Sequence, residues 1–145
     1  MTPLQKRAWL GLGVGVGMSL AILAVFIARG VASFDDDLVM RAIMYVLCVG
    51  GLLVYVVTLR IKRRKPGRPE VLLDERDEKI IKRATVLQLW AVLVSLFIWA
   101  IALTEAYWGQ ESIPIVFAYL IAISGLIVSI LAQAIGILIG YRRMS

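Results

Sequence analysis

Uncharged, apolar stretches alternate with short charged segments along the whole chain. Four stretches contain no charged residue, namely 8–28, 42–59, 84–104 and 112–141. A helix needs about 20 predominantly apolar residues to cross the hydrocarbon core of a bilayer. The pattern therefore predicts an all-α, polytopic membrane protein with four transmembrane helices, over about residues 8–28, 38–59, 84–107 and 113–140.

The third helix is expected to begin outside the membrane and to be the longest. Asp74 can cap its N-terminus, and acidic residues in the first turn complement the helix dipole. Two ion pairs are expected at the favourable i to i+4 spacing, Glu75 with Lys79 and Glu78 with Lys82. A helix over about 75–107 spans roughly 50 Å at 1.5 Å per residue, which exceeds the hydrocarbon core by several turns.

Basic residues gather on one side of the predicted spans. All of the 16 Lys and Arg residues except Arg29 and Arg41 fall in the N-terminal tail, the loop 60–83 or the C-terminal tail. The positive-inside rule then places both termini and this loop in the cytoplasm. We expect a multi-pass protein of the inner cell membrane, built from two helical hairpins with the same orientation.

Composition limits what else the chain can contain. With 145 residues, of which 61% are hydrophobic, the four spans leave room for one membrane domain over 1–145 and for no soluble catalytic domain. The net charge of +6 lies beside membrane ends, so it indicates contact with anionic lipid headgroups rather than nucleic acid. The basic run after the second span is the expected contact with headgroups or a partner: Arg60, Lys62, Arg63, Arg64 and Lys65.

The residue types used by common catalytic and metal sites are scarce. There is no histidine, and Cys48 is the only cysteine. The commonest zinc ligands and the usual proton shuttle at neutral pH are therefore missing. We predict no catalytic residues, no metal and no cofactor.

Small residues recur at helical spacing in two spans. Transmembrane helices associate through close backbone approach, which small side chains four residues apart allow. In the first span the expected packing residues are Gly13, Gly17 and Ala21, and in the fourth they are Ala132, Gly136 and Gly140. The sequence leaves open whether these faces meet within one chain or between copies in an oligomer.

A few polar residues lie within or near the spans. Arg41 and Glu105 lie about one turn inside the ends of the second and third spans, opposite the basic side. Charged groups in a membrane are costly unless paired, so we expect an Arg41–Glu105 ion pair, with Asp37 as a competing partner. The sharper alternative is an outward-facing ligand site at the same residues. Gln133, near the middle of the fourth span, is expected to hydrogen-bond across helices.

Asp74, Glu75, Arg76, Asp77 and Glu78 form an acidic-Arg-acidic motif just before the third span. With this motif and layout, the chain resembles an uncharacterised family of small four-helix membrane proteins from bacteria and archaea. The resemblance implies a fold and a location but no catalytic residues. The four carboxylates could bind a divalent cation, although the neighbouring Arg76, Lys79 and Lys82 favour a solvated, self-paired helix start.

These observations favour a non-enzymatic integral membrane protein that acts through its helices or its basic loop. Its partner would be a second copy or another membrane protein, and the role would be regulation, immunity or assembly of a complex. The alternative is a small oligomeric transporter or channel with an outward-facing site at Arg41 and Glu105. The mid-membrane carboxylate that four-helix multidrug carriers use is not present.

Overall fold

The computed structural model describes residues 3–30, 37–60, 75–110 and 112–143. Within these ranges the protein is all-α and contains no strand. The described helices are α1 (Pro3–Arg29), α2 (Leu38–Arg60), α3 (Glu75–Ala106) and α4 (Val116–Arg143). All four are long and apolar enough to cross a membrane. The predicted fold class is therefore confirmed, including the extension of α3 to Glu75.

Local signals explain where several of the helices begin and end. Gly30 stops α1 because it adopts a φ of 76°, a left-handed conformation that glycine reaches without steric cost. Asp37 caps α2, since its Oδ1 accepts a 2.8 Å hydrogen bond from the Val39 amide. Gly109, with a φ of 82°, lies in the short turn that follows α3. The uncharged stretches of the sequence thus end at residues suited to stop or start a helix.

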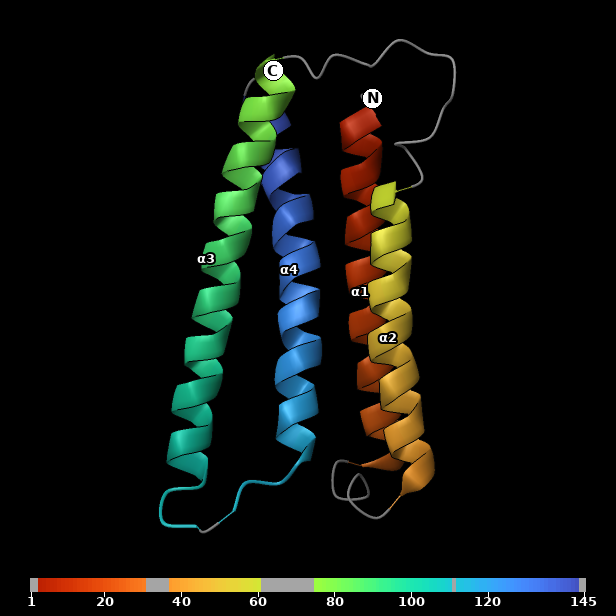
Figure 1. Ribbon diagram of the computed structural model, residues 1–145, viewed down its shortest axis with the longest axis vertical. Coiled ribbons are helices and arrows are strands. Elements are labelled where there is room, and N and C mark those ends of the chain that lie inside the picture. The colour runs from red at the N-terminus through yellow and green to blue at the C-terminus, as the bar shows by residue number, and fades with distance from the viewer. Residues whose placement is uncertain (1–2, 31–36, 61–74, 111, 144–145) are drawn as a thin grey trace.

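The helices lie side by side in the order α3, α4, α1, α2 (Figure 1). α4 packs against α3 and α1, whereas α2 packs mainly against α1. The start of α1 and the end of α4 lie at one end of the molecule, which we call the terminal end. The end of α1, the start of α2, the end of α3 and the start of α4 lie at the other, which we call the hairpin end. We call this arrangement an open row, with α2 and α3 as its outermost members, and α2 also contacts α4.

Two buried apolar clusters hold the row together. One lies toward the terminal end and joins α1, α3 and α4: Leu4, Ala8, Ile80, Ala84, Ile137 and Tyr141. The other lies toward the hairpin end and joins α1, α2 and α4: Ile22, Met40, Met44, Val116 and Ile123. Because α1 and α4 both contribute to both clusters, these two helices connect α2 and α3 to the rest of the molecule.

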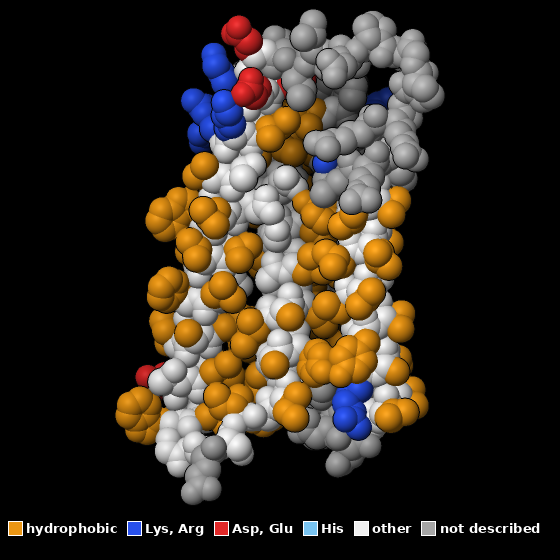
Figure 2. All heavy atoms as spheres, viewed as in Figure 1, with side chains coloured by type: hydrophobic (Ala, Val, Ile, Leu, Met, Phe, Trp, Pro, Cys, Tyr) orange, Lys and Arg blue, Asp and Glu red, His pale blue; other side chains and the backbone are white. Residues whose placement is uncertain are grey.

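Apolar side chains cover much of the outer surface. Figure 2 shows hydrophobic side chains along the length of the visible face, while most of the described charged side chains there gather at the terminal end. Trp90 and Phe97 on α3 are 63% and 70% exposed. Water disfavours such a surface and lipid accepts it. The fold is that of a multi-pass membrane protein.

Candidate functional site

The small-residue face of α4 packs against α3 of the same chain. A Cβ added at Gly136 would lie 2.9 Å from the Cα of Ala84, and one added at Gly140 would lie 2.8 Å from Cγ2 of Ile80. Both distances are shorter than real Cβ contacts, so the backbones of α3 and α4 approach closely at these glycines. Ala132, one turn further from the terminal end, is half-buried.

On α1, the glycines that pack against α4 are not the predicted ones. Close approach to α4 occurs at Gly15, where an added Cβ would lie 2.6 Å from Leu131 Cδ2, and at Gly11, where it would lie 3.7 Å from Ala134 Cβ. Gly13 and Gly17 are exposed, and a Cβ at either would meet nothing within 4 Å. Within the chain, α1 thus uses Gly11 and Gly15 instead of the expected Gly13 and Gly17.

Gly17 and Ala21 instead line an open apolar groove between α1 and α2. The groove has a volume of about 350 Å³ and no ionisable residue in its lining: Val14, Gly17, Met18, Ala21, Val46, Leu47, Gly50, Gly51 and Val54. An added Cβ at Gly50 would also meet nothing within 4 Å. We call this feature the α1–α2 groove. Its two open glycines leave helix backbone accessible from the membrane.

The structure does not bring Arg41 and Glu105 together. Arg41 lies on α2 and Glu105 on α3, the two outermost helices of the row, and no ion pair joins the two described side chains. Glu105 is exposed, whereas Arg41 is half-buried and its Nε has no hydrogen-bond partner among the described residues. Asp37 contacts Arg41 through the backbone, because its carbonyl accepts a 3.1 Å bond from the Arg41 amide.

The described part of the acidic motif forms the first turn of α3. Lys82 Nζ lies 2.8 Å from Glu78 Oε1, so the expected Glu78–Lys82 pair is present, and this pairing lowers the pKa of the Glu78 carboxyl below its ordinary value. No ion pair is found between the described side chains of Glu75 and Lys79. Asp74 and the basic residues Lys62, Arg63, Arg64 and Lys65 lie outside the described residues, as does the side chain of Arg60.

Asp77 connects two helices, a role that the charged motif in the sequence does not indicate. The hydroxyl of Tyr141, a residue only 7% exposed near the end of α4, donates a hydrogen bond to Asp77 Oδ1. This bond ties the start of α3 to the end of α4. No cluster of three or more residues able to hold a metal ion occurs among the described residues.

Two further hydrogen bonds join α3 to α4 within the spans. Gln88 Nε2 donates to Ser129 Oγ at 2.5 Å, and Trp99 Nε1 donates to Ser124 Oγ at 2.8 Å. Hydrogen bonds of this kind contribute about 0.6 kcal/mol on average in a membrane. Sequence reasoning missed both bonds, although a polar side chain every few turns of an apolar helix is a signal that could have suggested them.

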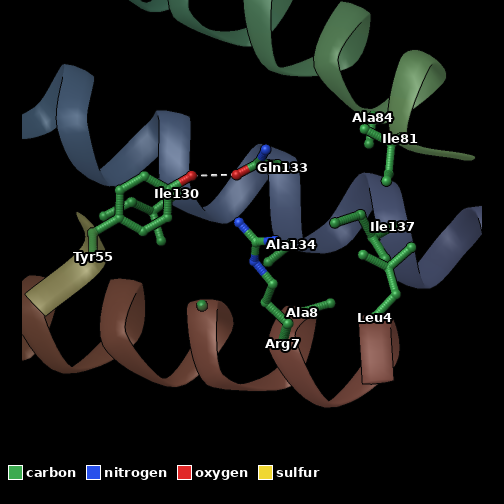
Figure 3. Close-up of a pocket in the computed structure, with 11 residues that line it drawn as sticks. Leu4, Arg7, Ala8, Tyr55, Ile81, Ala84, Ile130, Gln133, Ala134 and Ile137 are labelled. Carbon is green, nitrogen blue, oxygen red and sulfur yellow. Dashed lines mark hydrogen bonds between the residues drawn. The ribbon is translucent and has the colours of Figure 1, made fainter. Parts of the chain in front are cut away.

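Gln133 forms the interhelical bond expected of it. Its Oε1 accepts a hydrogen bond from the Tyr55 hydroxyl, which joins α2 to α4 (Figure 3). Both side chains line a cavity of about 90 Å³ that also receives Arg7 from α1. The described structure therefore contains two candidate sites, the apolar α1–α2 groove and this small cavity. We call the latter the polar cavity after Arg7, Tyr55 and Gln133, although its other lining residues are apolar.

No protein family, no curated protein and no solved structure matches the chain. The case for a function thus depends on the two sites themselves. The groove can accept an apolar helix surface. The polar side chains that line the cavity can donate hydrogen bonds to a ligand.

Proposed function

We propose that the protein is a non-enzymatic integral membrane protein that acts by helix–helix association, and that the partner in the α1–α2 groove is a second copy of the chain. The role would be regulation, immunity or assembly of a complex within the membrane. The supporting observation is that Gly17 and Gly50 line this groove with open space above them. Open glycines on a lipid-facing surface favour close approach by another transmembrane helix.

A contrast within the molecule supports this choice of occupant. The small-residue face of α4 is filled by α3, while Gly13 and Gly17 on α1 have no atom near their Cβ positions. A second copy offers the same face, and like faces can associate about a two-fold axis. The groove lining contains no charge, which suits a helix surface and disfavours a polar solute.

For orientation we propose that the terminal end is cytoplasmic. Lys82 and Arg83 near the start of α3, and Arg142 and Arg143 at the end of α4, lie at this end. Together with the basic loop, they meet the positive-inside rule. A protease added outside intact cells should leave the segment from Arg60 to Arg83 uncut. Cleavage there would contradict the orientation.

The test of the proposed function is self-association of the full chain at defined protein-to-lipid ratios, measured by energy transfer between labelled copies. The wild type should dimerise. Gly17→Leu and Gly50→Leu should weaken the dimer at least tenfold, about 1.4 kcal/mol, because the added side chains fill the groove. Each glycine has space for a Cβ, and the groove of about 350 Å³ leaves room for the rest of the leucine side chain, so the fold should survive.

Gly125→Leu is the matched control, because Gly125 on α4 also has nothing within 4 Å of an added Cβ but lies outside the groove. This variant should dimerise as the wild type does. A wild type that stays monomeric at every ratio, or equal weakening by all three substitutions, would contradict the proposal.

No observation on the described residues favours the alternative of a transporter or channel with a site at Arg41 and Glu105. The two side chains lie on helices that do not adjoin. Their joint use in one site would require a different helix arrangement.

A further inference from the structure

Arg7 points into the polar cavity, although it follows the exposed Lys6 directly in sequence. Figure 3 shows its guanidinium directed from α1 toward α4, on the side where Gln133 and Ala134 lie. Tyr55 reaches the same cavity from α2, and apolar residues such as Ile130 complete the lining. All four helices thus contribute to the lining around this basic side chain, which is half-buried.

Hydrogen-bond donors outnumber acceptors among the side chains of this cavity. The Tyr55 hydroxyl donates to Gln133 Oε1, which leaves the Gln133 amide nitrogen with its two N–H groups directed elsewhere. The Arg7 guanidinium adds five N–H donors and no acceptor. No carboxylate lines the cavity, and among the described residues neither the Arg7 guanidinium nor the Gln133 amide nitrogen has a hydrogen-bond acceptor or ion-pair partner.

The half-buried Arg7 guanidinium can be compensated by an anion or by water. Charged groups within a membrane protein are costly unless they are paired or reach water. The cavity of about 90 Å³ matches roughly three water molecules at about 30 Å³ each, which is also enough space for the oxygen atoms of one small anion. Arginine binds carboxylate and phosphate oxygens through two parallel N–H bonds.

We propose that Arg7 and Gln133 form a binding site for an oxyanion, a phosphoryl group above all. The group would come from an anionic phospholipid of the leaflet at the terminal end or from free phosphate. Arg7 would bind two oxygens through its guanidinium, and the Gln133 amide would donate to a third. Tyr55 positions the Gln133 amide by holding its carbonyl oxygen. This site is separate from the α1–α2 groove and does not depend on self-association.

The experiment compares the delipidated full chain with Arg7→Gln and with Lys6→Gln. Lys6→Gln is the matched control, since this substitution removes the same charge from an exposed neighbouring position. In the first arm, inorganic phosphate is titrated at constant ionic strength while thermal unfolding is followed. In the second arm, the chain is placed in nanodiscs of phosphatidylglycerol and phosphatidylcholine, and the phosphatidylglycerol that it retains is measured by native mass spectrometry.

Arg7→Gln should weaken phosphate or phosphatidylglycerol binding about tenfold or more, while Lys6→Gln should bind as the wild type does. A response in the first arm identifies free phosphate as a ligand, and selective retention in the second identifies the lipid headgroup. Absence of both responses in the wild type, or equal loss in the two variants, would overturn the proposal.

A second variant keeps the test decisive if Arg7→Gln does not fold. Gln133→Glu preserves the shape of the side chain and supplies a carboxylate facing Arg7. The internal carboxylate should pair with the guanidinium and abolish the response to phosphate or phosphatidylglycerol. A Gln133→Glu chain that still binds either probe as the wild type does would overturn the site.

Discussion

Two glycines of α4 differ in what surrounds them, and this difference predicts different costs for the same substitution. A Cβ at Gly136 would lie 2.9 Å from the Ala84 backbone, whereas a Cβ at Gly125 would meet nothing within 4 Å. We expect Gly136→Ala to lower the free energy of unfolding by about 1–3 kcal/mol through overpacking. Gly125→Ala should be neutral or should raise it by up to about 1 kcal/mol through better helix propensity. Unfolding in mixed detergent micelles measures both, and equal effects would contradict the close α3–α4 approach.

Glu78 provides a prediction about pH, because its pairing with Lys82 lowers the pKa of its carboxyl from an ordinary value of 4.5. A carboxyl with a lower pKa in the folded state stabilises the fold above its unfolded pKa. That contribution is lost as the pH falls from about 4.5 through the lower folded pKa. Because the pair is exposed, the contribution is small.

The measurement is the free energy of unfolding of wild type and Glu78→Gln from pH 7 to pH 3. The wild type should be the more stable chain at pH 7, and the difference between the two should disappear at low pH. A difference that stays constant over this range would show that the Glu78 charge has no part in stability.

Residue spacing alone could not decide which glycines of α1 face α4. Glycine occupies positions 11, 13, 15 and 17, so two pairs, Gly11–Gly15 and Gly13–Gly17, both have the i to i+4 spacing that helix packing uses. The two pairs face nearly opposite directions on a helix. The expected face was Gly13–Gly17, and the structure packs Gly11–Gly15 against α4.

At the scale of the element, helix identity and length followed directly from the charge-free stretches. The acidic motif marked the start of α3, and the structure begins this helix at Glu75. Uncharged helices in lipid carry little periodic signal of which side is buried, because lipid and protein interior are similarly apolar. Thus the sequence predicted four helices well, but it did not predict that Gln88 and Trp99 both bond to serines of α4.

The bond between Trp99 and Ser124 can be tested by a double-mutant cycle. Trp99→Phe removes the donor and Ser124→Ala removes the acceptor, so the combined loss should be smaller than the sum of the single losses. We expect a coupling energy of about 0.6 kcal/mol and not above about 1.7 kcal/mol. Trp90→Phe is the control, because Trp90 is 63% exposed on the same helix. It should show no coupling to Ser124→Ala.

At the scale of the whole molecule, the order of the helices decides which polar groups meet. Pairing Arg41 with Glu105 assumed that α2 and α3 adjoin, since both residues lie at similar depth near the hairpin end. The small-residue stripes of the first and fourth spans favoured α1 and α4 as packing helices, but they did not decide whether those faces meet within one chain or between copies. The polar cavity was hidden for the same reason, because Arg7, Tyr55 and Gln133 meet only when α1, α2 and α4 are placed together.

Crosslinking tests this order directly. In a Cys48→Ser background, Gly11→Cys with Ala134→Cys should form a disulfide, because the two Cβ positions lie 3.7 Å apart, within the usual range of about 3.5–4.5 Å. Arg41→Cys with Glu105→Cys should not, because their helices are the outermost pair of the row. Trypsin cleavage in the basic loop separates α1 and α2 from α3 and α4, so on a denaturing gel only a disulfide keeps the halves together. If the halves stay joined in the Arg41–Glu105 pair and separate in the Gly11–Ala134 pair, α2 and α3 adjoin and the open row is wrong.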